Sequence, residues 1–321
     1  MSRQILSTIL LFALSFLGNA QIPYTLTASD VTIVNGVIIT STLTNSNGDN
    51  YESDIIISKT IDGQAVTGIG ANAFEENGLT SVVLPDGLKF IGESAFKNNK
   101  LTSIDFPKGV TTIADSAFQN NRITSVALPS EMTSIANSVF ESNNITNVNF
   151  PSGLISIGHG AFRDNSLVDV DLPGGLTSIG SFAFQNNRIT HIIFPAKITI
   201  IEEMAFNVNF LTNIELPDGI TSIEDSAFRD NRLTSLDLPN GLTFIGPSAF
   251  LANRLTAVEL PNGLTFVGEN AFKTNSGLAS ISLPKSSNAN SAVQWKSSNG
   301  TVLDAKEVIL PVNFIYSYKR N

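Results

Sequence analysis

Apolar side chains recur in this chain with a period of 22 residues, most easily followed through one phenylalanine per period. Each copy follows the pattern A-F-x-x-N-x-L-T-x-V-x-L-P-x-G-L-x-x-I-G with few departures. The phase phenylalanines are Phe74, Phe96, Phe118, Phe140, Phe162, Phe184, Phe206, Phe228, Phe250 and Phe272. A regular period of this length predicts a solenoid, in which each coil packs only against its neighbours.

The stretch that follows each phenylalanine predicts a half-buried strand. In the copy that begins at Phe228, Leu236 and Leu238 alternate with Ser235 and Asp237. A proline then ends the strand and a glycine turns the chain, because proline cannot donate to a ladder and glycine tolerates unusual backbone angles. A second short extended run follows.

The segment before the next phenylalanine carries residues that commonly cap helical turns. They are Asp115, Asn137 and Asp225 in three of the copies. We therefore expect each coil to consist of a strand, a turn, a short strand and a helical turn. Stacked coils then bury continuous columns of Phe, Leu, Ile and Val.

Both ends of the array depart from the repeat. Residues 21–65 are β-rich, and Asn35-Gly36 between two alternating apolar runs is typical of a type I′ hairpin turn. We interpret this segment as an N-terminal β-rich cap, before an array over residues 66–284. Residues 285–321 form either a C-terminal β cap or a small appendage.

The first twenty residues predict a secretory signal peptide. Arg3 precedes an apolar run over residues 5–17, and small residues lead to a cleavage site near Ala20/Gln21. The alternative is a membrane anchor, but the run is shorter than the roughly 20 residues that a spanning helix needs. No later stretch is long and apolar enough to span a membrane. We expect a secreted protein or one on the outer cell surface.

The composition excludes several kinds of binding site and cross-link. The chain has no cysteine, which excludes disulfides and thiolate metal sites. The formal net charge of −9 argues against nonspecific binding to nucleic acid or to an anionic membrane. Stability must therefore come from the stacking of the coils.

The repeat resembles the BspA-like leucine-rich repeats of bacterial surface proteins. The copy over residues 161–180 carries the motif, with Asn165 and Leu167 after Ala-Phe and a Leu-Pro-x-Gly-Leu-x-x-Ile-Gly run at its end. The resemblance covers most of the chain and implies a leucine-rich-repeat solenoid, an extracellular location and adhesion to proteins of a host or neighbouring cell. It carries over no catalytic residue. One position differs from the family's pattern, because this chain has asparagine where the family often has cysteine.

This asparagine column is predicted to be structural. Each member lies beside a buried phenylalanine, where an amide must find hydrogen-bond partners, and stacked amides can bond to a neighbouring coil. The column comprises Asn77, Asn99, Asn121, Asn143, Asn165, Asn187, Asn209, Asn231, Asn253 and Asn275.

The outward strand positions are the candidate partner-binding sites, because the buried columns do not constrain them. Acidic residues dominate one of these positions, and a column of Lys or Arg lies five residues earlier in the coil. One interpretation is that these charges form an ordinary solvated surface. The other is that the acidic residues contact a basic partner or hold calcium weakly. The candidates are Asp105, Asp169, Asp171, His191, Ile193, Glu215, Asp237 and Glu259, with Phe210 interrupting the basic column of Lys100, Arg122, Arg188, Arg232 and Arg254.

Residues 182–210 break the pattern. Phe182, Ile193 and Ile200 place apolar side chains in variable slots, while Lys197 and Glu202 replace glycines. Apolar residues at outward positions can mark a contact patch, and drift in a tolerant repeat is the competing explanation.

Enzymatic chemistry finds little support. His159 and His191 occupy different slots, with no serine or cysteine nucleophile motif around either. Asp169 and Asp171 could act as a glycosidase pair, but they lie on an outward strand without a pocket. There is no phosphate-binding loop, metal-binding histidine spacing or nucleotide fingerprint. We expect neither enzymatic activity nor a cofactor.

These observations predict a monomeric protein-binding scaffold, adhesin-like, that uses the repeat surface to bind extracellular proteins. The alternative is a glycan-binding or accessory module of an extracellular polymer-degrading system. Aromatic platforms at the outward strand slots would favour that alternative, and those slots hold none.

Overall fold

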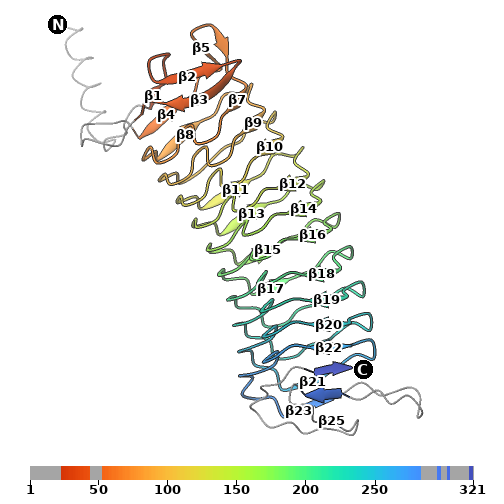
Figure 1. Cartoon of the computed structure of the whole chain (residues 1–321). Coiled ribbons are helices and arrows are strands. Elements are labelled where there is room, and N and C mark those ends of the chain that lie inside the picture. Colours follow the sequence, from red (N-terminus) through yellow and green to blue (C-terminus); the bar gives the residue numbers. More distant parts are fainter. Residues whose placement is uncertain (1–22, 44–52, 283–294, 298–301, 304–317, 321) are drawn as a thin grey trace, which may run out of the picture.

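The chain forms one elongated rod of stacked coils (Figure 1). The computed structural model describes residues 23–43, 53–282, 295–297, 302–303 and 318–320. Successive coils follow one another along the rod, with the N-terminal strands at one end and the C-terminal strands at the other. The predicted leucine-rich-repeat solenoid is confirmed.

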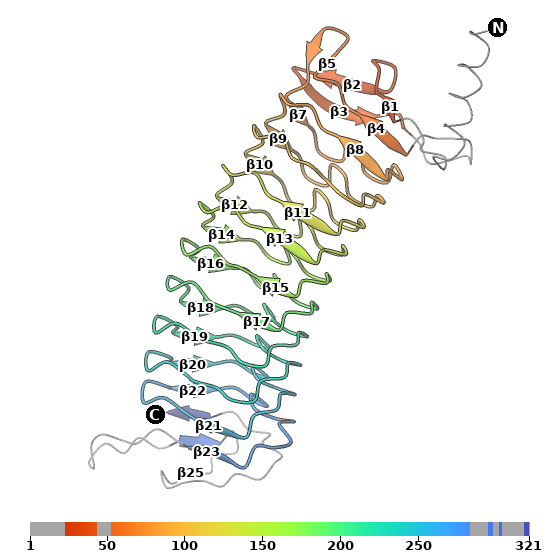
Figure 2. The ribbon, with the colours of Figure 1, turned by 180° about the vertical axis from the view of Figure 1, so that it is seen from behind.

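Two ladders of parallel strands run along opposite sides of the rod (Figures 1 and 2). Between two strands of the array, partners are 22 residues apart, as in Val126 with Val148, except that β21 and β23 are 23 apart. The first ladder contains β8 (Ser81–Val83), β11 (Ser125–Ala127), β13 (Asn147–Asn149), β15 (Asp169–Val170), β17 (His191–Ile192), β21 (Ala257–Glu259) and β23 (Ser280–Ser282). The second contains β7 (Gly68–Ile69), β9 (Phe90–Ile91), β10 (Thr112–Ile113), β12 (Ser134–Ile135), β14 (Ser156–Ile157), β16 (Ser178–Ile179), β18 (Ile200–Ile201), β19 (Ser222–Ile223), β20 (Phe244–Ile245) and β22 (Phe266–Val267).

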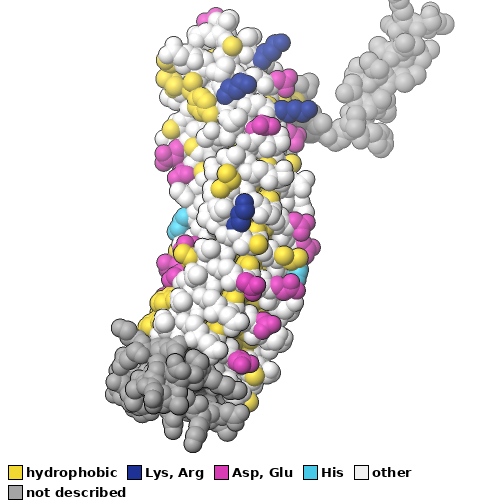
Figure 3. Space-filling model, turned by 90° about the vertical axis from the view of Figure 1, so that its right-hand side faces the viewer, with side chains coloured by type: hydrophobic (Ala, Val, Ile, Leu, Met, Phe, Trp, Pro, Cys, Tyr) yellow, Lys and Arg dark blue, Asp and Glu magenta, His cyan; other side chains and the backbone are white. Residues whose placement is uncertain are grey.

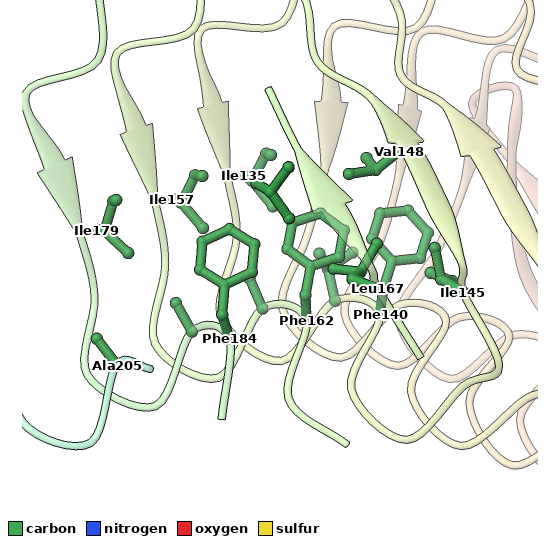
Figure 4. Packing of buried hydrophobic residues seen from close by; sticks show 14 of the residues in the cluster. Ile135, Phe140, Ile145, Val148, Ile157, Phe162, Leu167, Ile179, Phe184 and Ala205 are labelled. Carbon is green, nitrogen blue, oxygen red and sulfur yellow. The ribbon is translucent and has the colours of Figure 1, made fainter. Parts of the chain in front are cut away.

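The phase phenylalanines stack in the interior. Neighbouring rings lie 5.3–5.7 Å apart, centre to centre, and nearly parallel. Figure 4 shows Phe140, Phe162 and Phe184 in this column, with Ile157 and Ile179 of the second ladder nearby. Every coil therefore buries one aromatic ring against the next, and the column is continuous along the array.

The helical turn expected in each coil is wrong. A segment of turns without helix, residues 115–120 in the coil of Phe118, joins the second strand to the next coil. We call this segment of each coil the turn wall. In the coil of Phe118, Ser116 and Asn120 both have φ of 56°, in the left-handed region that an α-helix cannot continue through. The backbone N–H groups of these three residues donate to carbonyls of the next coil at 2.9–3.0 Å. The turn wall is thus hydrogen-bonded between coils.

The residues expected to cap helical turns serve other contacts. The Asp115 carboxylate accepts from the backbone N–H and side-chain amide of Asn137 in the next coil, at 3.0 and 3.1 Å. Asn137 in turn accepts from the backbone N–H of His159 at 2.9 Å. Asp225 accepts from the adjacent Ser226 hydroxyl. Asp115 and Asn137 therefore satisfy backbone donors of the following coil instead of capping a helical turn.

Strands before the first full coil extend both ladders. In the Asn35-Gly36 turn, φ is 53° and 78°, as a type I′ turn requires. The elements here are β1 (Tyr24–Thr25), β2 (Val31–Val34), β3 (Val37–Ser41), β4 (Asp54–Ile56), β5 (Thr60–Ile61) and β6 (Gln64–Ala65). β1 and β4 join β8 in the first ladder, and β2 and β3 join β7 in the second.

At the other end, three antiparallel strands follow β22 in its sheet. They are β24 (Trp295–Ser297), β25 (Val302–Leu303) and β26 (Tyr318–Arg320), and β26 pairs with β22. The C-terminal strand thereby covers the edge of the last coil in the second ladder. The expected signal peptide, with its cleavage site, lies outside the described residues.

Candidate interaction surface

The first ladder turns a row of carboxylates outward. We call Asp105, Asp171, Glu215, Asp237 and Glu259 the acidic row; all five are exposed and occupy the same slot of their coils. The neighbouring outward slot holds Asp169, on β15, whose Cα partner on β17 is His191. Ile193 bridges to Glu215 within the row and is 61% exposed. The structure thus brings these predicted site residues onto one face.

The acidic row has no cationic partner in the described part of the chain. The ion pairs there involve Arg163, with Glu141 and Asp164, and Arg229, with Asp230. Figure 3 shows the other side of the rod, that of the second ladder, on which acidic side chains are also spread along its length while Lys and Arg gather mainly toward the N-terminal end. The row is therefore a strip of carboxylates that form no ion pair within the described residues.

A basic row runs parallel to it. Lys100, Arg122, Arg188, Arg232 and Arg254 are all exposed, and they occupy the slot five residues before the acidic row. At about 3.3 Å per residue the two rows lie at most about 16 Å apart. None of these cations pairs with a carboxylate among the described residues.

Phe210 takes the place of a cation in the basic row. The residue is 37% exposed, and the guanidinium carbon of Arg232 in the next coil lies 4.0 Å from the centre of its ring. This distance is well within the range of a cation–π contact. The stacked pair is held on the surface by the coil spacing.

The asparagine column lies in the core and connects the coils. The Nδ2 group of Asn187 donates to the carbonyls of Phe162 and Phe184 at 2.9 and 3.2 Å, and its Oδ1 accepts from the Leu167 N–H at 3.0 Å. The other columnar asparagines from 99 to 275 repeat these contacts and are buried. Asn77 differs, because it bonds to Glu75 and Ser41 at the N-terminal end.

A family model decides the identity of the repeat. The BspA type leucine-rich repeat region, a model of six copies, matches residues 67–188, 133–254 and 177–299. The chain belongs to this family. The resemblance carried by the sequence motif is thereby confirmed, and the family consists of repeat scaffolds found on bacterial surfaces.

Solved structures of bacterial leucine-rich repeat proteins are similar to this chain. A leucine-rich repeat protein from Bacteroides ovatus is 22% identical, with a TM-score of 0.58, over 82% of this chain and 81% of that one. A leucine-rich cell surface protein from Faecalibacterium prausnitzii is 21% identical, with a TM-score of 0.46, over 83% of this chain and 89% of that one. The first supports the fold alone. No curated protein sequence is significantly similar to this chain.

The irregular residues of the BspA-type repeat at 182–210 do not form one patch. Ile193 lies on the first ladder and Ile200 on the second, while Phe182 and Met204 lie on the turn wall. Phe210 stands in the basic row. The structure distributes these side chains around the coil.

Backbone geometry marks the same segment, and the sequence reasoning missed this. Phe182, Met204 and Val208 have φ of 63°, 51° and 55°, at slots that BspA-type coils elsewhere in this chain fill mostly with Ser, Asn, Asp or Gly. A left-handed conformation costs an ordinary residue roughly 1–2 kcal/mol, and it is rarest for β-branched side chains. Phe182 is held by the His159 ring, at 5.0 Å between ring centres, and by Arg163.

One carboxylate of this segment has a perturbed environment. Burial, with the nearby charges of Glu224 and Glu203, raises the pKa of Glu202 above its ordinary value. Glu202 stands where most coils have glycine. Among the described residues no three His, Asp or Glu side chains are grouped to hold a metal ion. The acidic row therefore provides single carboxylates, spaced one coil or more apart.

No helix in the part of the chain that the structure describes is long and apolar enough to cross a membrane.

Proposed function

We propose that this protein is an extracellular, adhesin-like scaffold that binds a basic surface of another protein through the acidic row. The observation that carries the proposal is the row itself. Its carboxylates are exposed, in one line and free of ion pairs within the described residues. The predicted signal peptide supports an extracellular place of action.

The rigidity of the array suits it to this role. Neighbouring coils are joined by paired strands of the two ladders, by the turn wall, by the ring stack and by the asparagine column, so the carboxylates are held before the partner arrives. Little ordering entropy is then lost on binding. An acidic strip also attracts a basic partner during approach, which raises the association rate at low salt.

The same features argue for a binding role without catalysis. Asp169 and Asp171, the pair that could resemble glycosidase carboxylates, are both exposed on the outer face. Raising the pKa of a catalytic acid requires burial or a close like charge. A screen with polysaccharide and peptide substrates is expected to show no turnover above the rate without protein, and measurable hydrolysis would remove this part of the proposal.

Partner capture from extracts of candidate host or neighbouring cells tests the acidic row. In the test variant, Asp171, Glu215 and Asp237 are changed to lysine, which we expect to reduce recovery of the partner roughly tenfold or more, because like charges replace complementary ones. The matched control changes Asp86, Glu131 and Asp218 to lysine. These exposed carboxylates lie in the turns after the first strand and alter the net charge equally.

The control separates a local contact from a general charge effect. Loss of the partner only in the acidic-row variant supports the proposal. Equal recovery by the acidic-row variant and wild type, or equal loss by both variants, would remove the acidic row from the argument. Circular dichroism and melting curves establish that both variants are folded.

A further inference from the structure

We infer that the C-terminal part of the basic row, Arg188, Phe210, Arg232 and Arg254, binds a linear anionic polysaccharide that runs along the axis of the array. This surface is separate from the acidic row and goes beyond the proposed protein-binding role. The ligand class is a chain of sugars with a carboxylate or sulfate on successive residues.

The spacing of the row favours a linear, periodic ligand. The four residues lie on consecutive coils, and the phenylalanine rings of those coils are 5.5, 5.7 and 5.6 Å apart. One coil step is therefore similar in length to one pyranose residue of an extended polysaccharide. A polymer lying along the row presents an anion or a ring to each coil in turn, and successive contacts act at high effective concentration.

The contact between Arg232 and Phe210 prepares the guanidinium for an anion. Its carbon lies 4.0 Å from the ring centre, so the flat face of the cation is covered while its N–H edge stays available. That edge matches carboxylate and sulfate oxygens as a fork of parallel donors. The exposed part of the Phe210 ring provides an apolar platform for the C–H face of a sugar.

A line of free hydroxyls borders the row. Two residues after each row position stand Thr190, Thr212, Thr234 and Thr256, all exposed. In the described region their backbone groups bond between coils, whereas their hydroxyls make no hydrogen bond. A hydroxyl donates one hydrogen bond and accepts others, as recognition of sugar hydroxyls requires.

Electrostatics permit an anionic ligand here despite the acidic net charge. The acidic row lies at most about 16 Å away at 3.3 Å per residue, and within the described residues none of its carboxylates pairs with these arginines. The nearer carboxylates on the turn wall, Asp164 and Asp230, are paired with Arg163 and Arg229 at 3.3 and 3.1 Å. The local charge at Arg188, Arg232 and Arg254 is therefore positive.

Single-stranded nucleic acid fits this surface less well. Such ligands need aromatic platforms for successive bases, together with a dense positive groove. The row carries one aromatic ring, Phe210. An anionic glycan needs only one ring contact in addition to its charges.

Calorimetric titration of the full chain tests the inference. The probes are polyuronate oligomers of two to six residues, a sulfated oligosaccharide of matched length, a neutral oligosaccharide and oligothymidylate. We expect affinity for an anionic glycan to rise with length up to four residues and then level off, because four coils carry the row. Tighter binding of the polyuronate or of the sulfated oligomer identifies the charged group. Equal binding of the neutral sugar, or tighter binding of oligothymidylate, would overturn the inference.

Matched variants locate the site. Changing Arg188, Arg232 and Arg254 to glutamine should weaken glycan binding by roughly a hundredfold or more, because hydrogen bonds to charged groups are the strongest contacts that the row offers. The control changes Lys89, Lys108 and Lys197, exposed cations in or near the turns after the first strand, to glutamine. Undiminished binding by the arginine variant, with its melting unchanged, would refute the site.

Phe210→Ala and the acidic-row variant complete the test. We expect Phe210→Ala to weaken binding of the glycan by roughly tenfold, since it removes the ring contact and the support of Arg232. The acidic-row variant should bind the glycan at least as tightly as wild type. Loss of glycan binding in that variant would mean that the two rows are one site, whereas a failure of protein capture alone leaves the glycan site standing.

Discussion

The regular coils of residues 211–272 and the irregular coils of residues 182–210 share the same interior. Phe184 and Phe206 are as buried as Phe228, and Asn187 and Asn209 make the same contacts as Asn231. The outer slots differ, because the irregular coils place Phe, Met, Val and Ile where the regular ones mostly have polar residues. The interior therefore fixes the coil, and the outer slots vary without disturbing it.

The comparison also shows how strain is tolerated. Val208 keeps a left-handed backbone that valine disfavours, because the turn wall bonds it between coils: its N–H donates to the Arg229 carbonyl at 2.9 Å. The interior contacts of both neighbouring coils determine that geometry. At this slot the irregular segment thus stores more strain than a coil with aspartate there, such as that of Asp230.

The largest effect is expected in the shared interior. Asn187→Leu leaves the N–H of Leu167 without a partner and removes one of two amide donors from the carbonyls of Phe162 and Phe184, which keep Asn165 and Asn209. A buried unsatisfied group costs about 1–3 kcal/mol and each lost hydrogen bond about 0.5–1.5 kcal/mol, so we expect a loss of roughly 3 kcal/mol in unfolding free energy. Denaturant unfolding followed by circular dichroism measures it.

Asn231→Leu tests whether the two regions have the same interior. The same substitution in a regular coil should cost as much as Asn187→Leu, whereas Asn213→Leu, at an exposed residue whose backbone is outside the left-handed region, should cost much less. A marked difference between Asn187 and Asn231 would break the comparison. Unchanged melting of Asn187→Leu together with lost partner binding would assign the column to function.

The strain predicts a substitution that stabilises the irregular coils. Val208→Asn places at this slot a residue that tolerates the left-handed region, as Asn186 does in the preceding coil. We expect a gain of about 1 kcal/mol, the lower part of the range for left-handed strain, which is a rise of roughly 2–4 °C in melting temperature.

Val168→Asn is the matched control for this gain. Val168 is also an exposed valine, but its backbone is outside the left-handed region. It should show no stabilisation. If both variants gain similar stability, the effect comes from replacing an exposed valine by a polar side chain. If Val208→Asn gains none, its backbone is unstrained.

The sequence predicted the interior of the fold and missed the turn wall. A fixed period exposes which slots are buried, so the phenylalanine columns and the two strands could be derived without coordinates. The left-handed residues could not, because serine, as at Ser116, has no side-chain property that requires that conformation. Donors that bond to the next coil look the same in sequence as donors within a helical turn.

The candidate surface was predictable only slot by slot. Alternation along the strand identified Asp171 and Glu215 as outward, and the period placed Arg188 and Arg232 in one line. Whether the acidic and basic side chains form ion pairs depends on the distance between them across the coil, and the period does not specify that distance. The same holds for Phe210, whose contact with Arg232 requires the measured coil spacing.

The smallest predicted effect concerns Glu202, at a glycine slot of the irregular coils. Its pKa is raised, by burial and then by Glu224 and Glu203, so the folded state holds this proton more tightly than the unfolded state. Below the ordinary value of 4.5 both states are protonated and the residue has no effect. As pH rises through the raised pKa the folded state loses stability, because it must then ionise a disfavoured carboxylate.

Glu202→Gln should therefore raise the melting temperature slightly at pH 7 and leave it unchanged at pH 4. The effect is small because the side chain is partly solvated, which screens the repulsion. Glu203→Gln, at an exposed neighbour, is the control, and it should change melting less at pH 7. If Glu202→Gln still raises the melting temperature at pH 4, the instability comes from the shape of the side chain at a glycine slot. Only in that case would the irregular coil differ from its neighbours in packing instead of charge.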